Sequence, residues 1–167
     1  MRLLMNNRLF FIVFAWLLSS AALPASKTNL GDSGVLIELA TDLHFTEAPN
    51  YTNTDVYSVG ASALLWENVV LGASYHYWVA DIQELQGQLG IQWGNPRVRY
   101  RVLGGMGYPI SGKLVPDSKT LLLDSRFQVI LKLNSTVSWI IESGYRWAKL
   151  NLDLSGPFLG TGIGIHF

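Results

Sequence analysis

The segment Arg97–Tyr108, with the sequence RVRYRVLGGMGY, decides the fold. In its first half, arginine alternates with valine or tyrosine, so an extended chain places the basic side chains on one face and the apolar side chains on the other. A period of two residues predicts a β-strand with one polar and one apolar face. After residue 25, no segment has the length of a membrane helix or a sustained helical period, so we expect an all-β protein.

The same alternation recurs along the chain between short runs of turn residues. It predicts eight strands, at Gly34–Thr41, Val56–Trp66, Val70–Val79, Leu85–Trp93, Arg97–Tyr108, Leu121–Leu133, Val137–Trp147 and Phe158–Phe167.

The apolar faces of these strands carry tyrosine and tryptophan near the strand ends, as expected at two membrane–water interfaces. These interface aromatics are Tyr57, Tyr77, Trp93, Tyr100, Tyr108, Trp139, Tyr145 and Trp147. The opposite faces hold glycine, serine, glutamine, and arginine with matching acids, which suits a narrow lumen. A soluble sandwich is the alternative, with the apolar faces packed on each other. Because an open sheet edge leaves unpaired backbone groups in lipid, we predict a closed eight-stranded antiparallel transmembrane β-barrel.

The first 25 residues have the pattern of a secretory signal peptide. Arg2 and Arg8 precede the apolar run Leu9–Leu18, and small residues follow it, so we expect cleavage within Ala22–Ser26. The apolar run is shorter than the about 20 residues that span a bilayer as a helix, although an N-terminal anchor is the alternative. Residues 26–167 then form the barrel domain. Tight turns at residues 67–69, 94–96 and 134–136 alternate with longer connections. Because outer-membrane barrels have short periplasmic turns and longer outer loops, we predict that both termini face the periplasm.

Composition excludes several function classes. The chain has 167 residues, 12 Lys+Arg, 12 Asp+Glu and no cysteine. The absence of cysteine excludes disulfides, thiolate–metal sites and thiol nucleophiles. A formal net charge of zero gives no reason to expect a nucleic acid as partner. We expect no cofactor and no nucleic acid.

The last residues, LGTGIGIHF at Leu159–Phe167, alternate apolar side chains and end on an aromatic residue. Ile163, Ile165 and Phe167 resemble the sorting signal of Gram-negative outer-membrane proteins. With the signal peptide and the eight strands, the whole mature chain is similar to the small barrels of the outer membrane protein A and X type. The resemblance implies export by the general secretory pathway, assembly machinery for barrels as a partner, contact with outer-membrane lipid and lipopolysaccharide, and a monomer. No family-specific motif matches, so no functional residue is carried over.

The polar faces predict a network of charges in the lumen. If residues 134–136 form the turn of the sixth and seventh strands, Asp124 faces Arg146 and Gln128 faces Glu142. The predicted network consists of Glu38, His76, Gln88, Gln92, Arg99, Arg101, Asp124, Arg126, Gln128, Glu142 and Arg146. Such a network either closes the lumen as a structural core or lines a narrow pore, in which the basic excess favours anions.

Two further sites are conceivable. Ser74 and His76 share the lumen face, as a lipid A-modifying acyl hydrolase requires, but side chains two apart on a strand stand about 7 Å apart. Because the chain also lacks a His-x-Ser sequence like that of the lipid A deacylase barrels, we expect no enzyme. Asp42, His44 and Glu47 could bind a cation from the predicted first loop, although ordinary loop polarity explains them as well.

The predicted outer loops, including Asp42–Asp55 and Pro109–Thr120, carry more acidic residues than lysines. These acids are Asp42, Glu47, Asp55, Asp81, Glu84, Asp117 and Asp153. An acidic rim could share the divalent cations of the lipopolysaccharide leaflet. We therefore expect a structural or surface-interaction role, in which the loop Asp42–Asp55 contacts lipid or an external partner.

Overall fold

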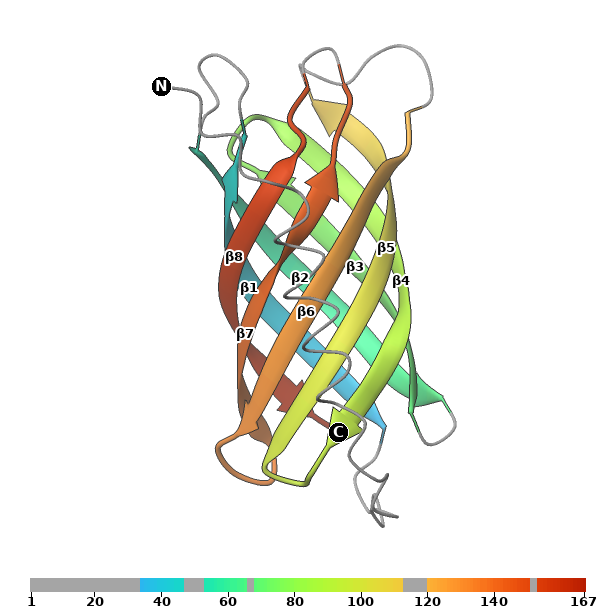
Figure 1. Ribbon diagram of the computed structural model, residues 1–167, viewed down its shortest axis with the longest axis vertical. Helices are drawn as coiled ribbons and strands as arrows, with labels where there is room; N and C mark the ends of the chain where they lie inside the picture. Colours follow the sequence, from blue (N-terminus) through green and yellow to red (C-terminus); the bar gives the residue numbers. More distant parts are fainter. Residues whose placement is uncertain (1–33, 47–52, 66–67, 113–119, 151–152) are drawn as a thin grey trace, which may run out of the picture.

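The computed structural model describes residues 34–46, 53–65, 68–112, 120–150 and 153–167. They form a closed barrel in which each strand pairs antiparallel with the next and β8 pairs with β1 (Figure 1). The strands are β1 (Val35–Phe45), β2 (Asn53–Leu65), β3 (Val69–Trp78), β4 (Ile82–Gly94), β5 (Val98–Gly112), β6 (Leu122–Lys132), β7 (Val137–Trp147) and β8 (Gly156–His166). The predicted fold is therefore confirmed.

Alternate side chains of each strand face outward and inward, because the pleat of a strand has a period of two residues. On β4, for example, Leu85 and Leu89 are more than half exposed, whereas Glu84 and Gln86, the two neighbours of Leu85 in the chain, are buried. Closure of the barrel leaves no unpaired strand edge. Among the described residues, no helix is long and apolar enough to cross a membrane.

Several strands are longer than the sequence analysis predicts, and this changes where some acids lie. β1 continues to Phe45, so Asp42 and His44 are strand residues with side chains that are fully buried in the barrel. β4 begins at Ile82, which buries Glu84 in the same way. The prediction that Asp42, His44 and Glu84 belong to exposed outer loops is wrong. The missed signal is the alternation itself, which continues through TDLHF at residues 41–45.

The long strand β5 contains one irregularity opposite β4. Gln83 pairs with Ser111 and Glu84 with Pro109, so Ile110 has no partner in the register. This β-bulge lets a proline lie within the strand, since the ladder hydrogen bonds are locally interrupted there. The connection from β3 to β4 is tight and places Asp81 at φ 61°, a left-handed conformation that aspartate tolerates in turns.

Buried apolar side chains form a cluster near each end of the lumen. At the end opposite the C-terminus, strand residues pack against residues of the β7–β8 connection (Figure 1). This outer cap consists of Val56, Trp78, Ala80, Ile82, Leu122, Ala148 and Leu154. At the other end, Leu36, Ile130 and Ile140 form an inner cap. The polar interior therefore lies between two apolar caps.

The backbone of the β7–β8 connection holds part of the outer cap in place. The amide of Leu154 donates to the carbonyl of Ala148 at 2.9 Å, and the amide of Ala148 donates to Ser155 Oγ at 3.0 Å. The backbones of Lys149 and Asp153 form an isolated antiparallel β-bridge in the same connection. These bonds hold the two described arms of the connection together, and Leu154 is fully buried against the strand residues of the outer cap.

Candidate functional site: the polar lumen

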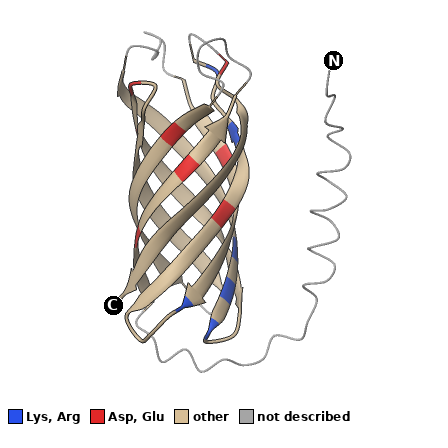
Figure 2. Ribbon diagram, turned by 90° about the vertical axis from the view of Figure 1, so that its left-hand side faces the viewer, with Lys and Arg blue, Asp and Glu red and all other residues tan. Residues whose placement is uncertain are grey.

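The inward faces of the strands place acidic and basic side chains inside the barrel, where they are buried. Figure 2 shows acidic positions mainly in the upper part of the barrel, whereas basic positions lie both there and at its lower end. The buried acids are Asp42, Glu84, Asp124 and Glu142, with Glu38 nearly buried, and the buried bases are Arg101, Arg126 and Arg146. A buried charge is costly without a partner, so the contacts of these groups decide what the lumen can do.

Arg126 on β6 lies at the centre of the network. Its Nη2 donates to Asp124 Oδ2 at 2.8 Å, and its Nη1 donates to Glu142 Oε2 at 3.1 Å. Gln128 Nε2 donates to the same Glu142 oxygen at 2.9 Å. The register pairs Asp124 with Arg146 and Gln128 with Glu142, as we predict from the hairpin turn.

Arg146 on β7 extends the network toward the outer cap. Its Nη2 lies 3.3 Å from Asp124 Oδ2 and donates to His76 Nδ1 at 3.1 Å. Its guanidinium also lies over two aromatic rings, 5.0 Å from the centre of Trp78 and 5.2 Å from that of Phe158. Cation–π contacts of this kind stabilise a cation that has lost its water.

A second ion pair lies nearer the inner cap. Arg101 Nη1 donates to Glu38 Oε1 at 2.9 Å and to Ser62 Oγ at 3.0 Å, while its Nε donates to Gln92 Oε1 at 2.7 Å. Gln128 bridges the two groups, because its Nε2 also lies 3.1 Å from Glu38 Oε2. Arg99, the other predicted member on β5, is half-buried two residues before Arg101.

Ser74 and His76 are hydrogen-bonded, with 2.8 Å between Ser74 Oγ and His76 Nε2. The sequence-based expectation that they stand too far apart is therefore wrong, because the side chains lean toward each other along β3. The pair still has the wrong polarity for catalysis. Since Nδ1 of His76 accepts from Arg146, which can only donate, the ring proton resides on Nε2 and is donated to Ser74. The histidine cannot then remove the proton of the serine, as an acyl hydrolase requires.

Several interior residues are absent from the predicted network, among them Ser62, which contacts both Glu38 and Arg101. Asp42, His44 and Glu84 lie in predicted loops, and Gln86, which the sequence analysis does not predict, links Asp124 to Ser74 and Gln88. Trp78 Nε1 donates to Glu84 Oε2 at 3.2 Å, and the ring of His44 packs edge-on against Trp78 at 5.1 Å. Glu47, the third residue of the predicted cation site, lies outside the described residues. Asp42 and His44 cannot bind a cation from an exposed loop, because both are inside the barrel.

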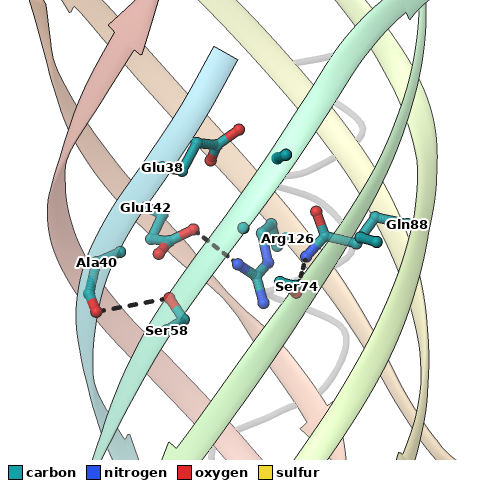
Figure 3. A pocket seen from close by; sticks show the side chains of 10 residues that line it. Glu38, Ala40, Ser58, Ser74, Gln88, Arg126 and Glu142 are labelled. Carbon is teal, nitrogen blue, oxygen red and sulfur yellow. Dashed lines mark hydrogen bonds and ion pairs between the residues drawn. The ribbon is translucent and has the colours of Figure 1, made fainter. Parts of the chain in front are cut away.

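A small cavity remains inside the network, next to Arg126 and Glu142 (Figure 3). Glu38, Ser58, Ser74 and Gln88 also line it. Its volume of about 10 Å³ has room for about one water molecule. Ser74 accepts from Gln88 at its edge, at 3.0 Å. The lumen at this level is filled by side chains.

The outer face carries all eight of the predicted interface aromatics. Trp93 and Tyr100 stack at 6.0 Å near the C-terminal end of the barrel, and Tyr145 and Trp147 lie 4.9 Å apart near the other end. Of the predicted sorting residues, Ile163 and Phe167 are more than half exposed and Ile165 is half-buried.

Comparison with known proteins supports the fold alone. No protein-family model and no curated protein matches the chain. A designed transmembrane β-barrel aligns over 81% of this chain and 97% of its own, with a TM-score of 0.63 and 14% identity. The N-terminal β-barrel domain of OprF from Pseudomonas aeruginosa aligns over 81% and 98%, with a TM-score of 0.62 and 16% identity. Neisserial surface protein A aligns over 82% and 99%, with a TM-score of 0.61 and 11% identity. The chain thus has the fold of the small eight-stranded outer-membrane β-barrels.

Proposed function

We propose that this protein is an integral barrel of a Gram-negative outer membrane, with a structural or surface-interaction role and a lumen that does not conduct. The supporting observation is the filled and capped interior inside a closed sheet with an apolar outer face. An apolar face around the whole sheet requires lipid rather than water, because burial of that face is the main favourable term. Closure also removes every strand edge, which suits a monomer.

The proposed life cycle follows from this role. The chain is exported by the general secretory pathway, the signal peptide is removed within Ala22–Ser26, and the barrel assembly machinery reads the C-terminal strand with Ile163, Ile165 and Phe167. The mature barrel then contacts phospholipid and lipopolysaccharide. The connections opposite the termini reach the cell surface, where they meet lipid or an external partner.

Two measurements test this proposal. Unboiled and boiled outer-membrane fractions are compared by gel electrophoresis, and a folded barrel migrates differently in the unboiled sample. A soluble periplasmic protein without such a shift contradicts the membrane assignment.

Purified barrel in a planar bilayer tests the closed lumen. We expect no stepwise conductance, since an apolar cap lies near each end of the filled polar interior. Reproducible single-channel steps favour the alternative of a narrow pore.

A further inference from the structure

Asp42 and Glu142 form one layer of the lumen together with a glycine. Asp42 on β1 pairs with Gly160 on β8, and Gly160 pairs in turn with Glu142 on β7. A Cβ atom on Gly160 would lie 1.9 Å from Asp42 Oδ1, so the carboxyl of Asp42 extends across the glycine toward β7. Asp42 and Glu142 therefore flank the same glycine in one layer, and each has a buried carboxyl oxygen without a hydrogen-bond donor.

No described residue supplies a hydrogen-bond donor to Asp42. It is fully buried, and neither Oδ1 nor Oδ2 receives a hydrogen bond from any N–H or hydroxyl group of the described residues. Glu142 uses Oε2 to accept from Arg126 and Gln128, whereas its Oε1 also lacks a donor. An ionised carboxylate only accepts hydrogen bonds, so a proton on one of these two carboxyl groups would supply the donor that the other lacks.

Both arginines and acids face this layer from the neighbouring strands. From β6, Arg126 and Asp124 face the pair, and Arg146 faces it from β7. His44 from β1, His76 from β3 and Glu84 from β4 are buried in the same half of the lumen. Glu38 from β1 approaches Glu142 through Gln128, whose Nε2 donates to both acids. Both arginines are already bonded to Asp124 or Glu142, so Asp42 has no cation of its own.

We propose that Asp42 and Glu142 together bind one proton inside the folded barrel at neutral pH. The proton lies between the two carboxyl groups, and the pair as a whole keeps a single negative charge that Arg126 neutralises. The lumen thereby contains a proton-binding site in the layer of Gly160. This site belongs to the folded barrel in any bilayer or detergent, so it goes beyond the proposed role in the envelope.

A metal ion is the other occupant that could join two carboxylates. The described residues contain no group of three or more histidine, aspartate or glutamate side chains that could hold one. The two nearby arginines also repel a divalent metal ion more strongly than they repel a proton, because its charge is larger. We therefore assign the position to a proton, and the experiment below includes a metal arm.

The proposal has a consequence for stability. Unfolded carboxyl groups lose their protons near pH 4, so above that pH the folded barrel binds one more proton than the unfolded chain. Stability then falls as the pH rises, and it falls until the pair itself loses the proton. For one proton, the equilibrium constant for unfolding increases about tenfold per pH unit within this window.

Infrared difference spectroscopy of the refolded barrel in detergent tests the site directly. We expect the carbonyl stretching band of a protonated carboxyl group at neutral pH, and loss of its intensity in both Asp42→Asn and Glu142→Gln. In each variant the new amide donates to the remaining carboxylate, which no longer needs a proton. Asp55→Asn, which changes an exposed acid of β2, is the matched control and keeps the band.

Urea unfolding between pH 5 and pH 9 provides a second readout. It compares the wild type with Asp42→Asn alone, so the test does not depend on the folding of Glu142→Gln. The pH dependence of the wild-type unfolding constant should exceed that of Asp42→Asn by up to about tenfold per unit. A band that survives in both variants, or equal pH dependences of wild type and Asp42→Asn, overturns the proposal. So does a wild-type pH dependence that vanishes when a divalent cation is added and returns with a chelator.

Discussion

The guanidinium of Arg146 donates a hydrogen bond from Nη2 to Nδ1 of His76, at 3.1 Å, within the barrel. This single bond determines the tautomer of the imidazole, because arginine has no acceptor atom. It leaves the proton on Nε2, where it is donated to Ser74. A serine and a histidine at hydrogen-bond distance therefore form part of a structural network rather than a nucleophile and its base.

We predict that Ser74→Ala and His76→Gln leave the lipid A of the host unchanged. The reason is that Ser74 Oγ accepts the Nε2 proton and lies in the buried network beside Gln86 and Gln88, so it has no access to an acyl chain. Lipid A is compared by mass spectrometry in cells without the protein, with the wild type and with each variant. An acyl chain that is lost only when Ser74 and His76 are both present would establish the hydrolase that we do not expect.

Arg126→Met is expected to destabilise the barrel by about 3–5 kcal/mol, because it leaves Asp124 and Glu142 as buried charges with fewer partners. The urea midpoint of the refolded barrel in detergent, followed by tryptophan fluorescence, measures the change. Arg97→Met is the control, since Arg97 is exposed at the β4–β5 turn and its loss should change stability little. Equal midpoints for the two variants contradict the central place of Arg126.

Gly160→Ala should destabilise the barrel by about 1–3 kcal/mol through a collision inside the lumen. The new Cβ atom would lie 1.9 Å from Asp42 Oδ1 and 2.9 Å from the carbonyl oxygen of Thr41. Gly87→Ala changes the same residue type on the outer face, where no atom lies within 4 Å of the added Cβ. We expect an altered gel shift or a lower urea midpoint for the first variant only, and the reverse order contradicts the assignment of the two faces.

The two faces also predict how tryptophan fluorescence responds to brominated phospholipid, which quenches only rings in contact with acyl chains. Trp78 is fully buried as part of the outer cap, whereas Trp139 is half exposed on the lipid-facing side. Trp78→Phe should therefore remove part of the unquenched emission, and Trp139→Phe should remove part of the quenched emission. Quenching of Trp78 in bilayer vesicles is the result that contradicts an inward position for this ring.

The alternation of side chains was sufficient to predict the closed barrel and most of its register. Val137–Trp147 has the same bounds in the sequence analysis and in the structure, and the turn at residues 134–136 sets the facing pairs of β6 and β7. Such local features follow from the sequence because the pleat has a fixed period and a tight turn determines which residues face each other.

Three features depended on the tertiary structure. The strand ends extend beyond the predicted limits because pairing with neighbours continues there, and this moves Asp42, His44 and Glu84 from expected loops into the lumen. The bond between Ser74 and His76 depends on side-chain rotamers, which the spacing of two residues does not define.

The placement of Asp42 and Glu142 in one layer depends on Gly160, which lies more than a hundred residues beyond Asp42 in the chain and is the partner of both. Period and turns are local properties of the chain, so the sequence by itself determined the barrel and its two faces. The partners of each buried charge are set by closure of β8 on β1, which brings distant residues into one layer, and only the tertiary structure decides them.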